Sequence, residues 1–157
     1  MTENVHIVKS EEETVALARE IVERRKGEKI VFALHGDLGA GKTRFAQGVA
    51  LALGVKEPVC SPTFAIALAY TGDRGVRFTH IDLYRLSDEG AVEDFGFEEI
   101  LAQSDVTAIE WPERAGRLLP PQTTHISFAF GATENERRIT SSTAGSRRYF
   151  PHQVKIP

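Results

Sequence analysis

The chain is poor in sulfur and has no long apolar segment. Its 157 residues include one cysteine, Cys60, which excludes an intrachain disulfide and a zinc site built from several cysteines. We expect Cys60 to be a small, partly buried residue and not a reactive thiol. No apolar run approaches the roughly 18 residues of a membrane-spanning helix, and the N-terminal residues lack the basic and apolar segments of an export signal. The sequence therefore predicts a soluble, cytoplasmic protein with no membrane partner.

The chain also has only a small excess of charge of one sign. With 19 Lys and Arg against 22 Asp and Glu, the formal net charge is −3. From Trp111 onward seven basic residues stand against three acidic ones, and the densest spots are the pairs Arg137 with Arg138 and Arg147 with Arg148. These pairs are too few and too scattered for the basic face of a nucleic-acid-binding protein. We expect them to form part of a solvated surface.

What the chain does have is a complete phosphate-binding loop. Residues 36–43 read Gly-Asp-Leu-Gly-Ala-Gly-Lys-Thr and fill every fixed position of the pattern G-x-x-x-x-G-K-[ST]. An apolar run at 30–34 predicts the preceding strand, and residues 45–53 predict the following helix. Backbone N–H groups and a lysine would hold the phosphates, while a hydroxyl would bind Mg2+. The predicted nucleotide-binding residues of this loop are Asp37, Leu38, Gly39, Ala40, Gly41, Lys42 and Thr43.

The rest of the chain predicts a single α/β domain over residues 1–157, because no repeat or linker divides it. A short strand at 5–8 precedes a helix that opens at Ser10 with a capping-box pattern. Further elements are an antiparallel hairpin of strands 64–70 and 76–83, a helix at 97–102, a strand at 106–109 and a late hairpin of 124–130 with 137–142. This order predicts a mixed sheet with a parallel centre, antiparallel outer strands and helices on both faces.

Two acidic residues follow predicted strands. Glu110 ends the apolar strand at 106–109 and is the natural candidate for a second anchor of Mg2+. Asp82 ends the preceding strand and would position an attacking water or join the outer shell of the metal, although a helix or turn cap is the alternative. Trp111 follows Glu110 directly and would either pack in the core or lie against the nucleotide.

A hydroxyl group follows the phosphate loop at a distance of about twenty residues. Residues 61–63 read Ser-Pro-Thr, and Thr63 is our candidate for a switch residue that senses the γ-phosphate through Mg2+. An ordinary proline turn that leads into a strand explains the same residues equally well.

Together these segments resemble one family. The motifs at 36–43, 61–64 (Ser-Pro-Thr-Phe), 80–86 (His-Ile-Asp-Leu-Tyr-Arg-Leu), 95–97 (Phe-Gly-Phe) and 109–113 (Ile-Glu-Trp-Pro-Glu) occur in the order and spacing of the TsaE family. This family comprises the small bacterial ATPases required for the threonylcarbamoyladenosine (t6A) modification of tRNA. The resemblance covers about residues 5–130, and the later hairpin and tail carry no motif that we can match.

The resemblance implies a partner-dependent ATPase. Such a protein binds ATP with Mg2+ and hydrolyses it slowly, in complex with the threonylcarbamoyl transferase and its non-catalytic paralogue (the TsaD and TsaB type), and meets tRNA only indirectly. Carried over by residue, Lys42 and Thr43 would contact phosphate and Mg2+, Glu110 would be a metal ligand, and Thr63 and Asp82 would be required for turnover. Trp111 would lie near the nucleotide, and Ser10 and Glu11 would lie near the base or ribose. No arginine can be assigned as a finger, so a partner would complete the site.

Three other functions share the same phosphate loop. A small-molecule kinase usually has an arginine-rich lid, and the candidate lid, the turn at 71–75, has one arginine. A GTPase would carry N-K-x-D, but the two asparagines, Asn4 and Asn135, lie outside such a motif. A non-hydrolysing module regulated by nucleotide is harder to exclude. It would release no phosphate even with its partners present.

Overall fold

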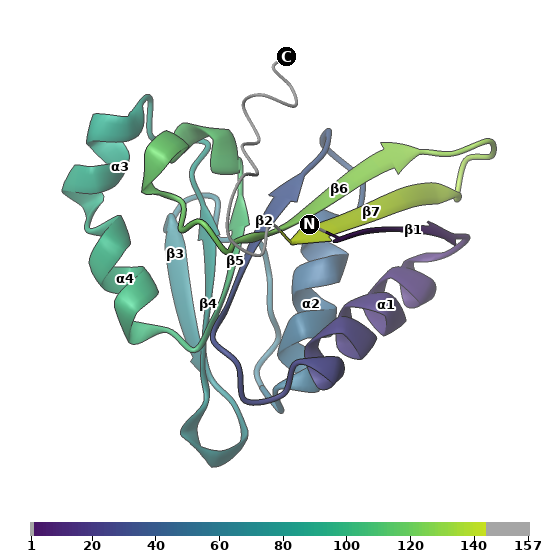
Figure 1. Cartoon of the computed structure of the whole chain (residues 1–157), viewed down its shortest axis with the longest axis horizontal. Helices are drawn as coiled ribbons and strands as arrows, with labels where there is room; N and C mark the ends of the chain where they lie inside the picture. The colour runs from purple at the N-terminus through teal and green to yellow at the C-terminus, as the bar shows by residue number, and fades with distance from the viewer. Residues whose placement is uncertain (1, 144–157) are drawn as a thin grey trace.

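The computed structural model describes residues 2–143, so the predicted surface pair Arg147 and Arg148 lies outside the described residues. Seven strands form one sheet, in the order β1-β7-β6-β2-β5-β4-β3 (Figure 1). The strands are β1 (Thr2–Val8), β2 (Ile30–His35), β3 (Ala67–Thr71), β4 (Arg77–Asp82), β5 (Val106–Glu110), β6 (Thr124–Phe130) and β7 (Arg137–Thr143). The helices are α1 (Glu11–Arg24), α2 (Lys42–Ala52), α3 (Glu89–Phe95) and α4 (Phe97–Gln103), with 3-10 turns η1 (Asp73–Gly75), η2 (Pro112–Arg114) and η3 (Gly116–Leu118).

The pairing of the strands confirms the predicted mixed sheet. The central strands β4, β5, β2 and β6 are parallel to one another. Outside them, β3 pairs antiparallel with β4, β7 with β6, and β1 with β7. Because the central strands run in one direction, their carboxyl ends meet at one edge of the sheet. The phosphate-loop motif follows β2 at that edge.

Helices cover both faces of the sheet, as the sequence predicted. Figure 1 shows α1 and α2 together on one side of the sheet and α3 and α4 on the other. The larger core lies under α1 and α2 and includes the fully buried rings of Phe32, Phe45 and Phe78. The smaller core includes Phe97 from α4 and Ile109 from β5. Strands buried on both faces explain the nearly continuous apolar runs in the sequence.

The first helix begins where the sequence predicted. The Ser10 hydroxyl accepts a hydrogen bond from the Glu13 backbone N–H at 3.1 Å, which caps the first turn of α1. The Glu13 carboxylate accepts in return from the Lys9 backbone N–H at 2.7 Å, one residue before the cap. This reciprocal pair is a variant of the predicted capping box.

The predicted elements differ from the structure in the loop that leads to β3, at the start of α2 and at α3. The strand predicted from residue 64 begins only at Ala67, because Ile66 N–H donates to the Pro62 carbonyl at 2.7 Å and Ile66 has a left-handed φ of 69°. Cys60, in the same loop, is exposed and not partly buried. Helix α2 begins at Lys42, three residues before the predicted start, and α3 was not predicted.

The turn at 71–75 is not a lid over the phosphate loop. It contains η1 and joins the end of β3 to the start of β4, whereas the phosphate loop lies at the edge where β4 ends. The Asp73 N–H donates to the Leu53 carbonyl at 2.8 Å, which fixes the turn beside the end of α2. The lid position proposed for a kinase is therefore wrong.

Within residues 2–143, no helix is both long enough and apolar enough to cross a membrane.

Helices α1 and α2 pack at close range at Gly48, which gives a prediction for stability. A Cβ added at Gly48 would lie 2.5 Å from the Val15 carbonyl oxygen and 2.7 Å from the Ala18 Cβ. Gly48→Ala should lower the free energy of unfolding by about 1–2 kcal/mol, because an overpacking cost of up to about 3 kcal/mol outweighs the gain of about 1 kcal/mol in helix propensity. Urea unfolding measures the difference.

Gly90→Ala is the matched control. Gly90 lies in α3, where the nearest heavy atom to an added Cβ is the Asp88 Oδ1 at 3.5 Å. This substitution should be neutral or stabilising. Equal stability of the two variants would show that the α1–α2 contact accommodates a methyl group.

Candidate functional site

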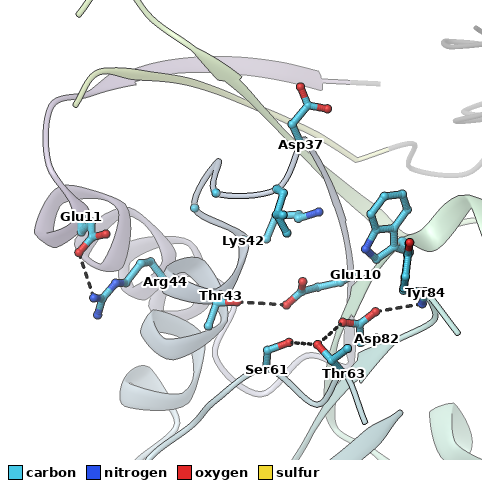
Figure 2. A pocket seen from close by; sticks show the side chains of 14 residues that line it. Glu11, Asp37, Lys42, Thr43, Arg44, Ser61, Thr63, Asp82, Tyr84 and Glu110 are labelled. Atoms are coloured by element: carbon cyan, nitrogen blue, oxygen red, sulfur yellow. Dashed lines mark hydrogen bonds and ion pairs between the residues drawn. The ribbon is translucent and has the colours of Figure 1, made fainter. Parts of the chain in front are cut away.

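A cavity of about 790 Å³ opens at the carboxyl ends of the central strands. It collects side chains from the start of α1, the phosphate loop, the 61–63 loop and the ends of β4 and β5 (Figure 2). Its lining residues are Glu11, Asp37, Leu38, Gly39, Gly41, Lys42, Thr43, Arg44, Ser61, Thr63, Asp82, Tyr84, Glu110 and Trp111. Most of the residues that the sequence singled out therefore meet in one place, although their roles stay predictions.

The loop and the start of α2 form a cradle of backbone N–H groups. Gly41 precedes α2 with φ 116°, a left-handed conformation that favours glycine. Within residues 2–143 no side chain caps α2, so its first N–H groups are available to an anionic ligand at the positive end of the helix dipole. The Lys42 side chain points into the same space, and its Nζ donates to the Gly36 carbonyl at 2.7 Å. This arrangement can bind a phosphate chain.

Thr43 and Glu110 bring two hard oxygen ligands together. The Thr43 Oγ1 lies 3.5 Å from the Glu110 Oε2, although the residues come from α2 and β5. Glu110 is only 5% exposed, and the same Oε2 accepts from the His80 Nε2 at 2.8 Å. A hydroxyl and a carboxylate beside a phosphate cradle form a donor set that suits Mg2+.

Asp82 connects the 61–63 loop to the sheet. Its Oδ2 accepts from the Thr63 Oγ1 at 3.1 Å, and its Oδ1 accepts from the Tyr84 backbone N–H at 2.9 Å. The Ser61 and Thr63 hydroxyl oxygens lie 2.9 Å apart, and Arg85 Nε donates to the Thr63 carbonyl at 3.1 Å. Asp82 thus caps the turn after β4, as one reading of the sequence held, and also fixes the candidate switch residue.

Trp111 both packs in a core and lines the cavity, so the two readings of its ring are compatible. Its ring packs against the smaller core and lies 5.0 Å from the Tyr84 ring. The Lys42 Nζ lies 5.0 Å from the centre of the indole, a cation–π distance. Trp111 has φ 59° and ψ 49°, which is rare for an aromatic residue and marks a turn held by its surroundings.

The two residues predicted near the base or ribose have different surroundings. Glu11 lines the cavity and pairs with Arg44 at 3.0 Å. Ser10 is not among the lining residues, and its hydroxyl caps α1. Ala40 is likewise absent from the lining and is 1% exposed in the larger core. A ligand in the cavity would therefore contact Glu11 and the lining residues of the phosphate loop, and not the side chains of Ser10 and Ala40.

A histidine pair lies on β2 and the adjacent β6, where β2 leads into the phosphate loop. His35, the last residue of β2, and His125 of β6 have stacked rings with centres 5.1 Å apart, and His35 Nε2 lies 2.9 Å from His125 Nδ1. Burial lowers the pKa of His125 to about 3, and the adjacent His35 adds to that effect. His125 is therefore neutral near pH 7.

Some of the site was missed in the sequence. Arg44, Tyr84 and Ser61 line the cavity but were not named as site residues. Arg44 directly follows the phosphate loop and carried no signal of its own, whereas Ser61 and Tyr84 lie within the quoted motifs at 61–64 and 80–86. His80 contacts Glu110 from the neighbouring strand, and its position two residues before Asp82 on a predicted strand was a signal that could have found it.

The comparisons with known proteins agree on one family. The sequence profile for "Threonylcarbamoyl adenosine biosynthesis protein TsaE" matches residues 8–139. A tRNA threonylcarbamoyladenosine biosynthesis protein TsaE from Aquifex aeolicus is 44% identical over 110 residues, covering 69% of this chain and 76% of the relative. The protein of the same name from Treponema pallidum is 40% identical over 120 residues, covering 76% and 87%.

The fold supports the same assignment. The crystal structure of YdiB from Bacillus subtilis superposes with a TM-score of 0.75 at 30% identity, covering 92% of this chain and 87% of YdiB. The profile match extends over most of the chain and includes the phosphate loop, Thr63, Asp82 and Glu110. The chain belongs to the TsaE family of threonylcarbamoyl adenosine biosynthesis proteins.

Proposed function

We propose that this protein is a Mg2+-dependent ATPase that serves the t6A modification of tRNA together with a threonylcarbamoyl transferase and its non-catalytic paralogue. Membership of the TsaE family supports the pathway. The observation that carries the activity is the meeting of Lys42, Thr43 and Glu110 in one cavity, with Thr43 Oγ1 3.5 Å from Glu110 Oε2. The phosphate loop, a hydroxyl and a buried carboxylate are the parts that nucleotide triphosphate hydrolysis requires.

The donor set fits magnesium. Magnesium in phosphate sites takes one or two protein oxygens and completes its shell with phosphate and water oxygens. Thr43 and Glu110 offer such a pair beside the loop. When bound, the ion neutralises charge that develops on the phosphates during transfer. Glu110 is buried, and its Oε2 accepts a hydrogen bond from His80.

The remaining residues bind, orient and exclude water. Lys42 would exchange its bond to the Gly36 carbonyl for the outer phosphates, and the indole of Trp111 would cover one side of them. Thr63 would contact the ion or the γ-phosphate. Asp82 would hold Thr63 by its hydrogen bond, and Asp82 would also orient the attacking water or an outer-shell ligand of the metal. Each role uses a side chain that already faces the cavity.

Among the described residues that line the cavity, none offers an unpaired guanidinium of the kind that completes fast ATPases. Among the described lining residues the arginine is Arg44, and its guanidinium already pairs with Glu11 at 3.0 Å. Two large apolar side chains, Leu38 in the phosphate loop and Phe64 beside Thr63, are 88% and 85% exposed. A partner that covers these loops would order Thr63 and exclude water from the phosphates.

The position of the turn at 71–75 weakens the kinase alternative. This turn lies at the start of β4, at the end of the sheet opposite the phosphate loop, so it cannot cover the nucleotide as a lid. The non-hydrolysing module remains the competing function. Steady-state phosphate release from the assembled complex separates the two functions. Release above that of the partners alone supports an ATPase, and none supports a module that only binds nucleotide.

Lys42→Ala should weaken ATP binding by at least about tenfold, because a hydrogen bond to a charged group contributes about 1.5–3 kcal/mol. Isothermal calorimetry measures the affinity, and thermal unfolding checks that the fold persists. Lys56→Ala is the control, since Lys56 is exposed and lies outside the cavity. Unchanged affinity of the Lys42 variant would remove the loop as the binding site.

Glu110→Gln should lower phosphate release by at least about tenfold while ATP binding changes much less, because the amide keeps the shape but removes the charge that Mg2+ prefers. Glu113→Gln, three residues further on and exposed, should behave as wild type. The assay follows phosphate release by the complex across a series of Mg2+ concentrations. Normal turnover by Glu110→Gln would move the acidic anchor to Asp82.

Thr63→Ala should still bind ATP but lose most of the stimulation by the two partner proteins, because its hydroxyl would no longer connect the γ-phosphate to the loop surface. The isolated wild-type protein should be a poor ATPase, since a group supplied by a partner raises such rates by about 10³–10⁵ where one is used. Thr63→Ser keeps the hydroxyl and should retain the stimulation.

Phosphate release is measured for wild type and both Thr63 variants, each alone and with the transferase and its paralogue. Equal wild-type rates with and without the partners would return the protein to the class of self-sufficient ATPases. Equal stimulation of wild type and Thr63→Ala would leave the partner dependence intact and remove Thr63 as its reporter.

A further inference from the structure

A buried histidine outside the cavity lining contacts the candidate metal ligand. His80 lies on β4 and is 0% exposed, and its Nε2 is 2.8 Å from the Glu110 Oε2 on the adjacent strand. On the same face of β4, Phe78 stacks below it with ring centres 6.4 Å apart and planes at 21°. Because His80 does not line the cavity, it touches a ligand only through Glu110.

The hydrogen bonding fixes which ring nitrogen carries the proton. The His80 Nδ1 is buried and has no hydrogen-bond partner among the described residues. An ionised carboxylate can only accept, so Nε2 must carry the hydrogen that it shares with Glu110. The bare Nδ1 lone pair costs less than an unsatisfied N–H would in the same surroundings. His80 is therefore a directed donor aimed at one carboxylate oxygen.

Glu110 needs such a donor. It is the last residue of β5, and the backbone turns into a left-handed conformation at Trp111 immediately after it. Its Oε2 receives the hydrogen bond from His80 and also faces Thr43 Oγ1 at 3.5 Å. A hydrogen bond to one oxygen fixes the rotation of the carboxylate, which determines the oxygen that it offers to an ion.

We propose that His80 is a positioning residue that holds the Glu110 carboxylate in its metal-binding orientation beside Thr43. The inference rests on the proposed role of Glu110 toward Mg2+. It assigns to the first residue of the His-Ile-Asp-Leu-Tyr-Arg segment a task that differs from that of Asp82, which fixes the 61–63 loop. One strand, β4, then supports both halves of the site, with His80 acting on the metal ligand and Asp82 on the candidate switch residue.

The test compares two substitutions of similar volume. His80→Gln keeps an N–H donor near the position of Nε2, whereas His80→Leu fills the space without a donor. Calorimetry with a non-hydrolysable ATP analogue measures nucleotide affinity in EDTA and across a series of Mg2+ concentrations. His80→Leu should raise the Mg2+ concentration that half-maximally strengthens nucleotide binding by about 10–100-fold, the usual loss when the partner of a metal ligand is removed.

Two controls separate positioning from packing. Nucleotide affinity in EDTA should be the same in wild type, His80→Gln and His80→Leu, because the phosphate loop is untouched. His80→Gln should respond to Mg2+ more like wild type than like His80→Leu. In a Glu110→Gln background, adding His80→Leu should change the Mg2+ response little, since His80 acts only through the Glu110 carboxylate.

If His80→Leu fails to fold, His80→Asn replaces it as the donor-free variant, meaning a variant with no donor at the Nε2 position, because the shorter amide does not reach that position. A wild-type Mg2+ response in the donor-free variant overturns the inference, as does an equal loss of affinity in EDTA and in Mg2+. If Glu110→Gln alters the Mg2+ response but the donor-free variant does not, only the inference fails. If nucleotide binding by the wild type ignores Mg2+, the metal role of Glu110 fails and the inference fails with it.

Discussion

The parallel hydrogen-bonded ladder of β2, β5 and β4 is the constraint on which the site depends. Its register pairs Leu34 with Glu110 and Glu110 with Asp82, so both acidic residues stand at the same height as the end of β2. The phosphate loop follows β2 after His35, so Lys42 and Thr43 return to that height at the start of α2. A shift of one residue in this register would turn Glu110 toward the opposite face of the sheet.

Along β4 and β5, on the sheet face covered by α1 and α2, the buried side chains change from apolar to acidic toward the carboxyl ends of the strands. Phe78 and Val106 lie in the larger core, whereas Asp82 and Glu110, at the carboxyl ends of the same strands, are buried at the cavity. Buried charges are costly unless hydrogen bonds or opposite charges compensate them. Here Asp82 accepts two hydrogen bonds, and Glu110 accepts one from His80. The cavity thus gathers negative groups that a cation would stabilise.

Local patterns predicted most of the fold and the centre of the site. The phosphate loop, the capped first helix, the buried strands and the late hairpin each have a signal that lies within one short segment. The start of β3 was wrong because apolar residues 64–66 look like strand, while a hydrogen bond to Pro62 and the φ of Ile66 make them a turn. Helix α3 was missed because it buries one residue, Val92, and so shows no apolar period, whereas α4, of the same length, has the helical i, i+4 pair Phe97 and Leu101.

Contacts between distant segments could not be predicted in the same way. Arg44 and Glu11 form an ion pair between α2 and α1, and His80 reaches Glu110 from another strand. The spacing of His80 and Asp82 places both on one face of a strand, but neither contact follows from a local pattern, because each partner depends on how helices and strands pack together. Ser10 shows a different limit, because here a correct local pattern does not predict the environment of the side chain. The cap that predicts the start of α1 also occupies the hydroxyl that the family resemblance brought near the nucleotide.

The left-handed turn at Trp111 also ends the alternation of side chains between the two faces of the sheet. Consecutive residues of a strand point to opposite faces, so a carboxylate and a ring that are neighbours in sequence would normally be separated by the sheet. Because the chain leaves the extended conformation at Trp111, Glu110 and Trp111 both line the cavity. Two adjacent positions therefore supply a charge and an apolar wall to one cavity. β-branched residues, which adopt left-handed backbone poorly, fit this position badly for reasons of backbone shape alone.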